Sequence, residues 1–391
     1  MGKNVMPLTR VLWFAGVIIT LAMGIRHSFG LFLEPLSAGG GRETIAFAFA
    51  ILNLLWGAAQ PFAGAWADRA GARRVLVAGA LAYAAGLWTL AVPGMPLLGS
   101  VMIGIGLAGT TYGVVFGVVG KLAPPHRRSQ AMGLTAAAGS LGQFLLLPAG
   151  QWGIDHLGAS PTLLVFAALT LLIVPLAWPL RVEGIERPSQ PVGDAFREAM
   201  RHPGFLLLSA SYFVCGFQVS FVGVHLPAFL ADRGLSSSVG ALSLALIGLA
   251  NIVGTWLFGH MGARHDKSRL LSGIYACRAL AIVLFVLLPV TPASAIAFSA
   301  AIGFLWLGTV PLTNGIIAGI FGVHYLSMLG GLVFFAHQLG SFFGIWLGGR
   351  VYDSTGSYDP VWWASVVLGV MAALLCLPIR ERPLQRAEAG A

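Results

Sequence analysis

The sequence contains few charged residues. Of its 391 residues only 9% are Asp, Glu, Lys or Arg, while 57% are hydrophobic, and the mean hydropathy is +0.84. Soluble globular domains carry about 25% charged residues. This composition therefore excludes a soluble domain and predicts a chain surrounded by lipid. Acidic residues are scarcest where the sequence is most apolar, since no apolar run has an Asp or Glu in its middle.

Several kinds of functional motif are also missing. The sequence has no P-loop, no two-glycine nucleotide fingerprint, no Cys/His metal cluster and no recognisable nucleophile triad. We therefore expect no catalytic residues, no metal and no cofactor, so the protein is not predicted to be an enzyme. The three cysteines, Cys215, Cys277 and Cys376, lie inside apolar runs and form no disulfide pattern, and we expect them to be small core residues.

Twelve apolar runs are long enough to cross a bilayer as helices. A membrane-spanning helix needs about 20 residues, and charged or Pro/Gly-rich breaks separate the runs. The first run is long enough to span, so we interpret it as a membrane helix and not as a cleaved signal peptide. The runs are 10–33, 44–67, 74–92, 96–121, 129–152, 161–180, 204–230, 237–261, 268–289, 292–321, 326–352 and 360–379.

One long polar stretch, residues 181–202, divides these runs into two sets of six. We interpret it as a linker that holds a short surface helix near Asp194–Met200. The predicted fold is an all-α membrane protein with an N-terminal six-helix bundle (1–180), a cytoplasmic linker (181–202) and a C-terminal six-helix bundle (203–391).

Basic residues are distributed unequally between the two sides of the predicted membrane. If the N-terminus is cytoplasmic, the inner segments hold 18 of the 23 Lys and Arg residues, and the outer segments hold only Arg42, Arg233 and Arg350. Inner loops of membrane proteins carry this excess, so both termini are predicted to be cytoplasmic. The net charge of +9 follows from this pattern and does not indicate a nucleic-acid partner.

The two halves of the sequence repeat one another. The segment Gly24–Phe29 matches Gly216–Phe221 at an offset of 192, and Pro35 then falls on Pro227. Two further blocks match at offsets of 198 and 199. A six-plus-six parallel repeat is typical of carriers in which two bundles rock about a central site near the middle of the bilayer.

Arg26 and Arg278 are the two basic residues inside apolar runs. A cation in hydrocarbon is costly, and it is a functional-site candidate by default. Because no carboxylate shares the middle of a run, the partner could be an anion that enters and leaves. A guanidinium binds a carboxylate through two parallel hydrogen bonds. Alternatives stay open: Arg26 could bond backbone carbonyls or Glu34, and Arg278 could have a structural or gating role.

Other polar residues near the middle of the spans complete the candidate substrate site. Gln218 is the repeat partner of Arg26, and each midspan polar group needs a hydrogen-bond partner in lipid. A histidine titrates near physiological pH, so His337 is also the candidate for proton coupling. Bonds between helices are the alternative for all of these side chains. The predicted substrate-binding residues are Arg26, Gln218, Gln143, Arg278, Tyr112, Asn251 and His337.

A glycine-rich basic loop follows the second span. The residues Gly64, Asp68, Arg69, Gly71 and Arg73 resemble the G-x-x-x-D-R-x-G-R-R signature of the major facilitator superfamily, with Ala72 at one basic position. The second half has a degenerate copy without the Asp. An Asp at a helix end can bind Arg and a neighbouring helix N-terminus. We therefore predict that this loop is a gate that holds one state of the carrier shut.

Within that superfamily, three strings resemble bacterial monocarboxylate-porter carriers of the oxalate/formate-antiporter type. They are Gly24–Phe32, Asn53–Gly64 and His337–Gly344 with Asp353–Asp359. The resemblance implies alternating access, a small carboxylate as substrate, and a bacterial inner (plasma) membrane. This chain lacks the arginine that such carriers often have in the eighth helix, and it has His337 where the oxalate type has a lysine. One carboxylate per substrate therefore fits better than two.

Three functions remain as alternatives. The first is a secondary transporter of small monocarboxylates, by proton symport or anion exchange, that works as a monomer. The second is a proton-coupled exporter of drugs or amphipathic metabolites, but the fifth helix, Gly139–Gly150, does not match the glycine-proline motif of such exporters. The third is a membrane sensor or scaffold, for which no signalling domain is present in the sequence.

Overall fold

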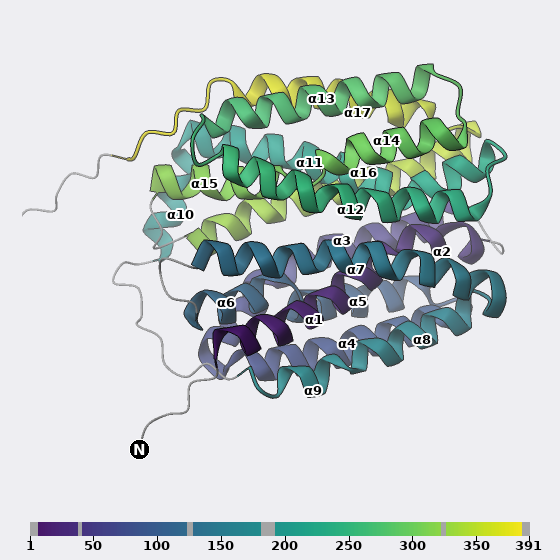
Figure 1. The fold of residues 1–391 in the computed structure, drawn as a ribbon, viewed down its shortest axis with the longest axis horizontal. Coiled ribbons are helices and arrows are strands. Elements are labelled where there is room, and N and C mark those ends of the chain that lie inside the picture. Colours follow the sequence, from purple (N-terminus) through teal and green to yellow (C-terminus); the bar gives the residue numbers. More distant parts are fainter. Residues whose placement is uncertain (1–6, 38–40, 123–127, 181–191, 322–325, 385–391) are drawn as a thin grey trace, which may run out of the picture.

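The structure is a computed structural model that describes residues 7–37, 41–122, 128–180, 192–321 and 326–384. Within these ranges the chain is helical and contains no strand. Figure 1 shows α1 to α9 in one half of the molecule and α10 to α17 in the other, with most helices running along the same long direction. The predicted all-α fold is confirmed for the part of the chain that the structure describes.

The first half contains nine helices among its described residues. They are α1 (Leu8–His27), α2 (Phe29–Leu36), α3 (Arg42–Ala70), α4 (Ala72–Ala91), α5 (Pro96–Thr110), α6 (Tyr112–Leu122), α7 (Arg128–Leu157), α8 (Ala159–Leu171) and α9 (Ile173–Ala177).

The second half contains eight helices among its described residues. They are α10 (Val192–Arg201), α11 (Pro203–Asp232), α12 (Ser237–Met261), α13 (Lys267–Leu287), α14 (Pro292–Phe304), α15 (Thr309–Phe321), α16 (Leu326–Thr355) and α17 (Asp359–Cys376). The short helix predicted near Asp194–Met200 is present as α10. The boundaries of the two bundles stay a prediction.

Eleven helical segments in the described chain are long and apolar enough to cross a membrane. Each of these segments lies at one of the twelve predicted spans. The predicted span without such a segment is the fifth, 129–152, where α7 is a 30-residue helix that is not among the eleven. The structure therefore supports eleven of the twelve predicted membrane helices.

Several predicted spans contain a break. Ser28 separates α1 from α2, Thr111 separates α5 from α6, and residues 305–308 separate α14 from α15. Broken helices in a membrane survive only where other groups satisfy the freed backbone polar atoms. At the third break, Arg278 Nη2 donates to the Leu305 carbonyl at 2.6 Å, and Leu307 N donates to Asn251 Oδ1 at 2.9 Å. Side chains of α12 and α13 therefore replace the missing helical bonds.

Repeated glycines make the same kind of contact in both halves. A Cβ on Gly24 of α1 would meet the Gly142 oxygen of α7 at 2.6 Å. In the second half, a Cβ on Gly216 of α11 would meet the His337 oxygen of α16. A Cβ on Gly340, the repeat partner of Gly142, would meet the Phe213 oxygen of α11 in the same way. The internal repeat seen in the sequence therefore corresponds to equivalent close helix packing.

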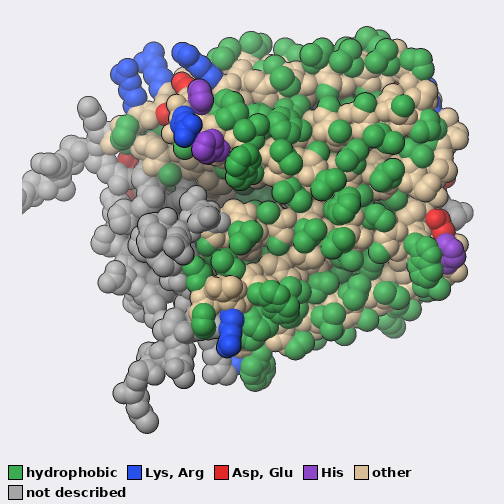
Figure 2. Space-filling view, viewed as in Figure 1, with side chains coloured by type: hydrophobic (Ala, Val, Ile, Leu, Met, Phe, Trp, Pro, Cys, Tyr) green, Lys and Arg blue, Asp and Glu red, His purple; other side chains and the backbone are tan. Residues whose placement is uncertain are grey.

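The two ends of the molecule differ. We call the end where α1 begins and α17 stops the linker end, because α10 lies there (Figure 1), and we call the opposite end the far end. Figure 2 shows Lys and Arg side chains gathered at the linker end of the second half. Hydrophobic side chains are scattered over the surface between the ends (Figure 2). This surface matches a molecule that spans a membrane between two polar ends.

Candidate functional site

Arg26 lies near the end of α1, and its side chain is buried between the helices. It is 9% exposed, Nη2 donates to Asn53 Oδ1 of α3 at 2.6 Å, and Nε is buried without a partner. Among the ion pairs between described residues none includes Arg26, so no pairing with Glu34 is found. The guanidinium therefore has an amide neighbour and spare donors, but no carboxylate in the described chain.

Asn53 joins Arg26 to the second half. Asn53 Nδ2 donates to the Phe49 carbonyl at 2.7 Å, which turns its Oδ1 toward Arg26. The Asn53 carbonyl accepts from Gln338 Nε2 of α16 at 3.0 Å. A movement of α16 relative to α3 would therefore disturb the group that holds Arg26.

An aromatic side chain forms one wall beside Arg26. The Arg26 guanidinium carbon lies 5.9 Å from the Trp56 ring centroid, within cation–π range. The indole Nε1 donates to Thr111 Oγ1 at 2.9 Å, and the ring packs edge-on against Phe334 of α16 at 5.3 Å. These contacts fix the ring beside the Arg26 guanidinium.

His337 lies on α16 one residue before Gln338. It is 8% exposed, its Nδ1 is 3.0 Å from Gln338 Oε1, its ring stacks against Phe334, and the tilted Tyr212 ring lies 4.9 Å away. Through Gln338 and Asn53 the histidine is connected to Arg26. The predicted substrate residues Arg26 and His337 thus belong to one hydrogen-bonded chain that crosses between the halves.

Gln143 and Asn251 lie where α7 meets α12, on a second line of contact between the halves. Gln143 Nε2 donates to the Leu244 carbonyl at 2.9 Å, and Asn251 Nδ2 donates to Ser140 Oγ at 2.9 Å. Asn251 Oδ1 also accepts from Thr255 at 2.9 Å. Both amides hold the bundles together in this state, and they would be released if α7 and α12 separated.

Tyr112 begins α6 immediately after the break at Thr111. Its hydroxyl lies against Gly139 of α7, where a Cβ would not fit, and its ring lies 5.0 Å from Phe116. The side chain is partly exposed. It remains a candidate for substrate contact.

Gln218 and Arg278 line the same small gap within the second half. Gln218 Nε2 donates to the Ser365 carbonyl of α17 at 2.9 Å, while its Oε1 is buried without a partner. Both side chains line a gap of about 150 Å³ that has no room for a water-sized sphere. Gln218 is therefore bonded toward α17, although the repeat had suggested a position across from Arg26.

Arg278 is directed at backbone carbonyls. Its Nε and Nη2 donate to Leu305 O at 3.1 and 2.6 Å, Nη2 also donates to Trp306 O, and Nη1 lies 3.3 Å from Cys215 Sγ. The side chain is 1% exposed. These contacts match the structural alternative considered for this residue. We therefore leave Arg278 out of the proposed site.

The predicted gating loop connects α3 to α4. Gly71 has a φ of 89°, a left-handed conformation that favours glycine. The Arg73 guanidinium lies 4.4 Å from the Trp178 ring centroid of its own half, and nothing lies within 4 Å of a Cβ placed on Gly64. The side chains of Asp68 and Arg69 lie outside the described residues, so the gating role stays a prediction.

At the far end, polar contacts join the halves. Arg42 of α3 makes a bidentate pair with Asp232 of α11 at 2.6 and 2.8 Å, and its guanidinium lies 4.1 Å from the Tyr352 ring centroid. Asp353 of α16 accepts from the backbone N–H groups of Arg42 and Glu43 at the start of α3. We call these residues the far-end latch.

Sequence reasoning missed some of these residues as members of the site. The sequence did not identify Gln338 as a partner of Asn53 or Cys215 as a partner of Arg278. It predicted for Asn53 only that a midspan polar group needs a hydrogen-bond partner, and for Trp56 an apolar wall, with lipid or packing contact as the alternative. No sequence signal was available, because the contacts join positions from 27 to 285 residues apart. The cysteine prediction was wrong at one position, since Cys277 is exposed while Cys215 and Cys376 are buried.

The fold and site define a polytopic helical membrane protein with two similar halves and a buried cation, Arg26, whose partner Asn53 contacts the second half. A sequence model of the Major Facilitator Superfamily matches residues 12–344. The protein therefore belongs to this superfamily of membrane transporters.

Similar proteins agree with this assignment. The chain is 24% identical to an uncharacterized MFS-type transporter, YcxA, of Bacillus subtilis, covering 95% of this chain and 96% of the relative. It is 24% identical to the oxalate:formate antiporter of Oxalobacter formigenes (96% and 93% covered). It is also 27% identical to monocarboxylate transporter 11 of Mus musculus (87% and 80% covered).

Solved structures show the same fold. A D-xylose-proton symporter superimposes with a TM-score of 0.75 at 16% identity, covering 96% of this chain and 99% of that one. A bacterial homologue of the human lysosomal transporter Spinster gives a TM-score of 0.71 at 17% identity, covering 96% and 97%.

Proposed function

We propose that this protein is a secondary transporter of small organic anions with a single carboxylate, and that Arg26 binds this carboxylate. One observation carries the proposal: the buried guanidinium of Arg26 is held by an amide, keeps a free Nε, and has no carboxylate partner among the described residues. A carboxylate can accept two hydrogen bonds from such a group. The names of two relatives, an oxalate:formate antiporter and a monocarboxylate transporter, support an anionic cargo.

The arrangement of the halves supports alternating access. The far-end latch joins α3 to α11 and α16, so that end is closed. Toward the linker end, nothing lies within 4 Å of a Cβ placed on Gly64, Gly133 or Gly331, which belong to α3, α7 and α16. We infer that the bundles pivot so that Arg26 is reached from the linker end in this state.

The charge distribution supports an orientation. The linker end carries the basic loops, and basic loops stay on the cytoplasmic side of bacterial inner membranes. We propose that both termini lie in the cytoplasm and that the state described here opens inward. One chain contains both bundles and the site, so a monomer suffices for transport.

Histidine is the proposed group for proton coupling. His337 is connected to Arg26 through Gln338 and Asn53. Protonation of the His337 ring would therefore affect the hydrogen bonds that hold Arg26 at the anion site. If this coupling operates, the carrier is a proton–anion symporter. If it does not, the same site performs anion exchange.

Uptake into proteoliposomes tests the proposal. Radiolabelled lactate, pyruvate, formate and oxalate are offered at two pH values, with an amphipathic cation as the test of an exporter. We expect saturable uptake of at least one monocarboxylate. Arg26→Gln should lower it roughly a hundredfold, because charge-assisted bonds to a buried cation are worth about 3 kcal/mol.

Arg10→Gln is the matched control, since Arg10 lies exposed on the same helix and its loss removes the same charge. It should keep wild-type uptake. Arg26→Lys should recover part of the activity, because an ammonium keeps the charge but not the bidentate geometry. Normal monocarboxylate uptake by a folded Arg26→Gln protein would remove Arg26 from the site.

A further inference from the structure

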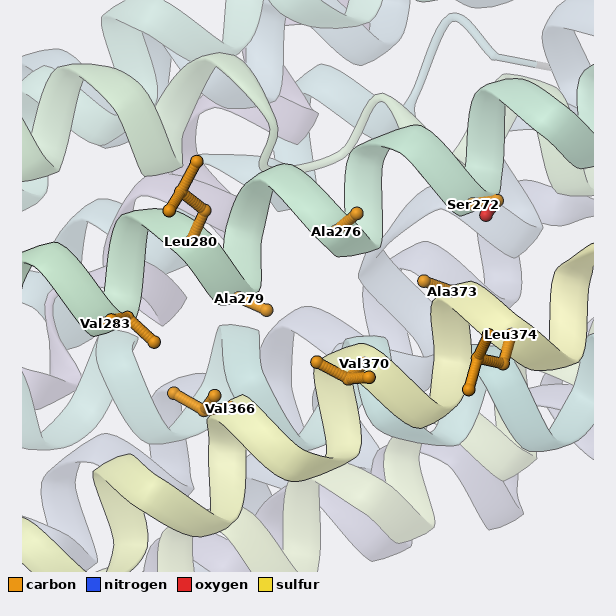
Figure 3. A pocket seen from close by; sticks show the side chains of 9 residues that line it. All are labelled: Ser272, Ala276, Ala279, Leu280, Val283, Val366, Val370, Ala373 and Leu374. Carbon is orange, nitrogen blue, oxygen red and sulfur yellow. The ribbon is translucent and has the colours of Figure 1, made fainter.

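A groove opens on the outer face of the second half, between α13 and α17. It encloses about 480 Å³ and is lined by nine side chains (Figure 3). Ala279 and Val283 on α13 face Val366 and Val370 on α17 across it (Figure 3). The remaining lining residues are Ser272, Ala276, Leu280, Ala373 and Leu374.

The groove faces away from the contact between the bundles. Leu280, Val370 and Leu374 at its edges are 58%, 48% and 60% exposed. Both helices are long and apolar enough to span a membrane. In the bilayer this surface therefore meets lipid, and small side chains such as Ala276 and Ala279 leave room for an acyl chain between the helices.

A basic residue continues the groove toward the linker end. Arg269 lies three residues before Ser272 on α13, and residues at this spacing share one face of a helix. Its side chain is 81% exposed, and its ion pair, with Asp266, is a long 3.8 Å contact at the surface. Such a pair is worth little, so Arg269 is free to bind another anion.

Arg380 brings a second positive charge to the same end. The next residue, Glu381, bonds Lys267 Nζ at 2.9 Å and Ser268 N at 3.0 Å, which ties the chain after α17 to the start of α13. The carboxylate of Glu381 is therefore already occupied. Among the ion pairs between described residues, none includes Arg380.

We propose that this groove binds an anionic diacyl phospholipid, with an acyl chain between α13 and α17 and the headgroup phosphate at Arg269 and Arg380. The apolar groove fits the chain, and the two guanidinium groups fit the phosphate. Basic pockets between membrane helices on the cytoplasmic side are known to bind such headgroups. The site is separate from Arg26 and does not depend on what the protein transports.

A second copy of the chain fits this face less well. A twofold dimer places the same surface on both subunits, so two grooves would face each other and leave a void without packing contacts. With the twofold axis along the membrane normal, Arg269 of each copy would also lie at the same end. Like charges would then approach each other, whereas a lipid phosphate neutralises them.

Native mass spectrometry of the full chain in detergent tests the proposal. The probes are dioleoyl phosphatidylglycerol and dioleoyl phosphatidylcholine at equal concentration. The wild type should bind phosphatidylglycerol more tightly, by roughly fivefold for each of the two arginines. The double substitution Arg269→Gln, Arg380→Gln should remove this preference, and Ala276→Trp, which fills the groove, should weaken binding of both lipids.

Two matched controls separate the site from general effects. Arg201→Gln removes an exposed charge from α10 at the same end, and Val165→Trp adds an indole to a 48% exposed position on α8 of the other half. Both should keep wild-type lipid binding. Circular dichroism checks that Ala276→Trp is folded, and the exposed arginine substitutions test the headgroup independently.

Three results would overturn the proposal. The first is equal binding of the two lipids by the wild type. The second is displacement of phosphatidylglycerol by millimolar inorganic phosphate, which would identify a site for free anions. The third is a dimer that Ala276→Trp converts to a monomer without change in lipid binding, which would assign the groove to a second copy.

Discussion

The two buried arginines differ in what their donors meet. Arg278 donates to carbonyls at the break between α14 and α15, so its hydrogen bonds replace those that a continuous helix would make. Arg26 donates to an amide oxygen and has a buried Nε without a partner. The contacts of Arg278 stabilise the fold, whereas Arg26 has a hydrogen-bond donor left to bind a ligand.

Substitution of Arg278 should therefore affect folding more than binding. Arg278→Gln removes the guanidinium donors that reach the Leu305 and Trp306 carbonyls, and a buried polar group left unpaired costs about 1–3 kcal/mol. We expect a lower thermal unfolding temperature in detergent for this variant. A folded, equally stable Arg278→Gln protein that has lost substrate binding would instead place Arg278 in the substrate site.

His337 can be tested separately from Arg26. His337→Gln keeps a polar side chain beside Gln338 but removes a ring that can take up a proton. We expect exchange of labelled for unlabelled substrate to continue, while accumulation driven by a pH gradient is lost. Accumulation that persists in His337→Gln proteoliposomes would assign proton coupling to another group.

For single residues, the sequence identified Arg26 and Arg278 as unusual but did not identify the groups that they contact. Both arginines were recognised because charges are rare in apolar runs. Their different environments could not be predicted, because Asn53 and Leu305 each lie 27 residues from the arginine they contact. The packing of neighbouring helices in the folded protein decides whether a guanidinium N–H group donates to a carbonyl, donates to an amide or has no partner.

The bounds of the helices were predicted well where the length of an apolar run sets the length of the helix. The spans at α4, α12 and α13 agree with the structure within a few residues, because a bilayer sets their length. Breaks inside spans were not predicted. The gap between α14 and α15 contains no proline, and its freed polar groups are satisfied by Arg278 and Asn251 from other helices.

Helix α13 begins with a side-chain cap that can be measured. Asp266 accepts from the backbone N–H groups of Ser268 and Arg269 at 3.0 and 3.2 Å. Asp266→Ala should destabilise the protein by about 1 kcal/mol in thermal unfolding, because the helix loses its N-cap. Asp266→Asn is the matched control and should lose less, since Asn also caps helices well.

The cap should also depend on pH. Hydrogen bonds from the Ser268 side chain and from backbone amides hold the pKa of Asp266 below its ordinary value. A carboxyl whose pKa is lower in the folded protein than in the unfolded chain stabilises the folded state at pH values above its unfolded pKa, which is about 3.9 for Asp. This stabilisation is lost as the pH falls through the folded pKa. The stability difference between wild type and Asp266→Ala should therefore shrink in acid. A constant difference from pH 7 to pH 3 would contradict the role of the charge.

For the whole molecule, the sequence predicted the internal repeat and the positively charged linker end, but it did not predict the far-end latch. The repeated glycines pack alike in the two halves, because a parallel repeat builds the same helix contacts twice. The positive linker end followed from counting charges. Arg42 and Asp232 are 190 residues apart, and the pairing depends on how the bundles dock.

The far-end latch should set the balance between the two open states. Arg42→Gln removes a bidentate pair worth about 2 kcal/mol, which would shift the equilibrium roughly thirtyfold toward opening at the far end. Spin labels at Met95 and Leu288, on opposite halves and both exposed, report this opening as a longer distance. The labels are introduced on a Cys277→Ala background, because Cys277 is exposed.

Arg233→Gln provides the comparison for this experiment. Arg233 pairs with Asp359 at 3.4 Å, both side chains are about half exposed, and both belong to the second half. Loss of that pair changes no contact between the bundles, so the distance between the labels should stay as in the wild type. If Arg42→Gln also leaves the distance unchanged, the Arg42–Asp232 pair does not hold the far end closed. The bonds from the backbone N–H groups of Arg42 and Glu43 to Asp353, together with the packing of α3, α11 and α16, would then have to keep that end shut.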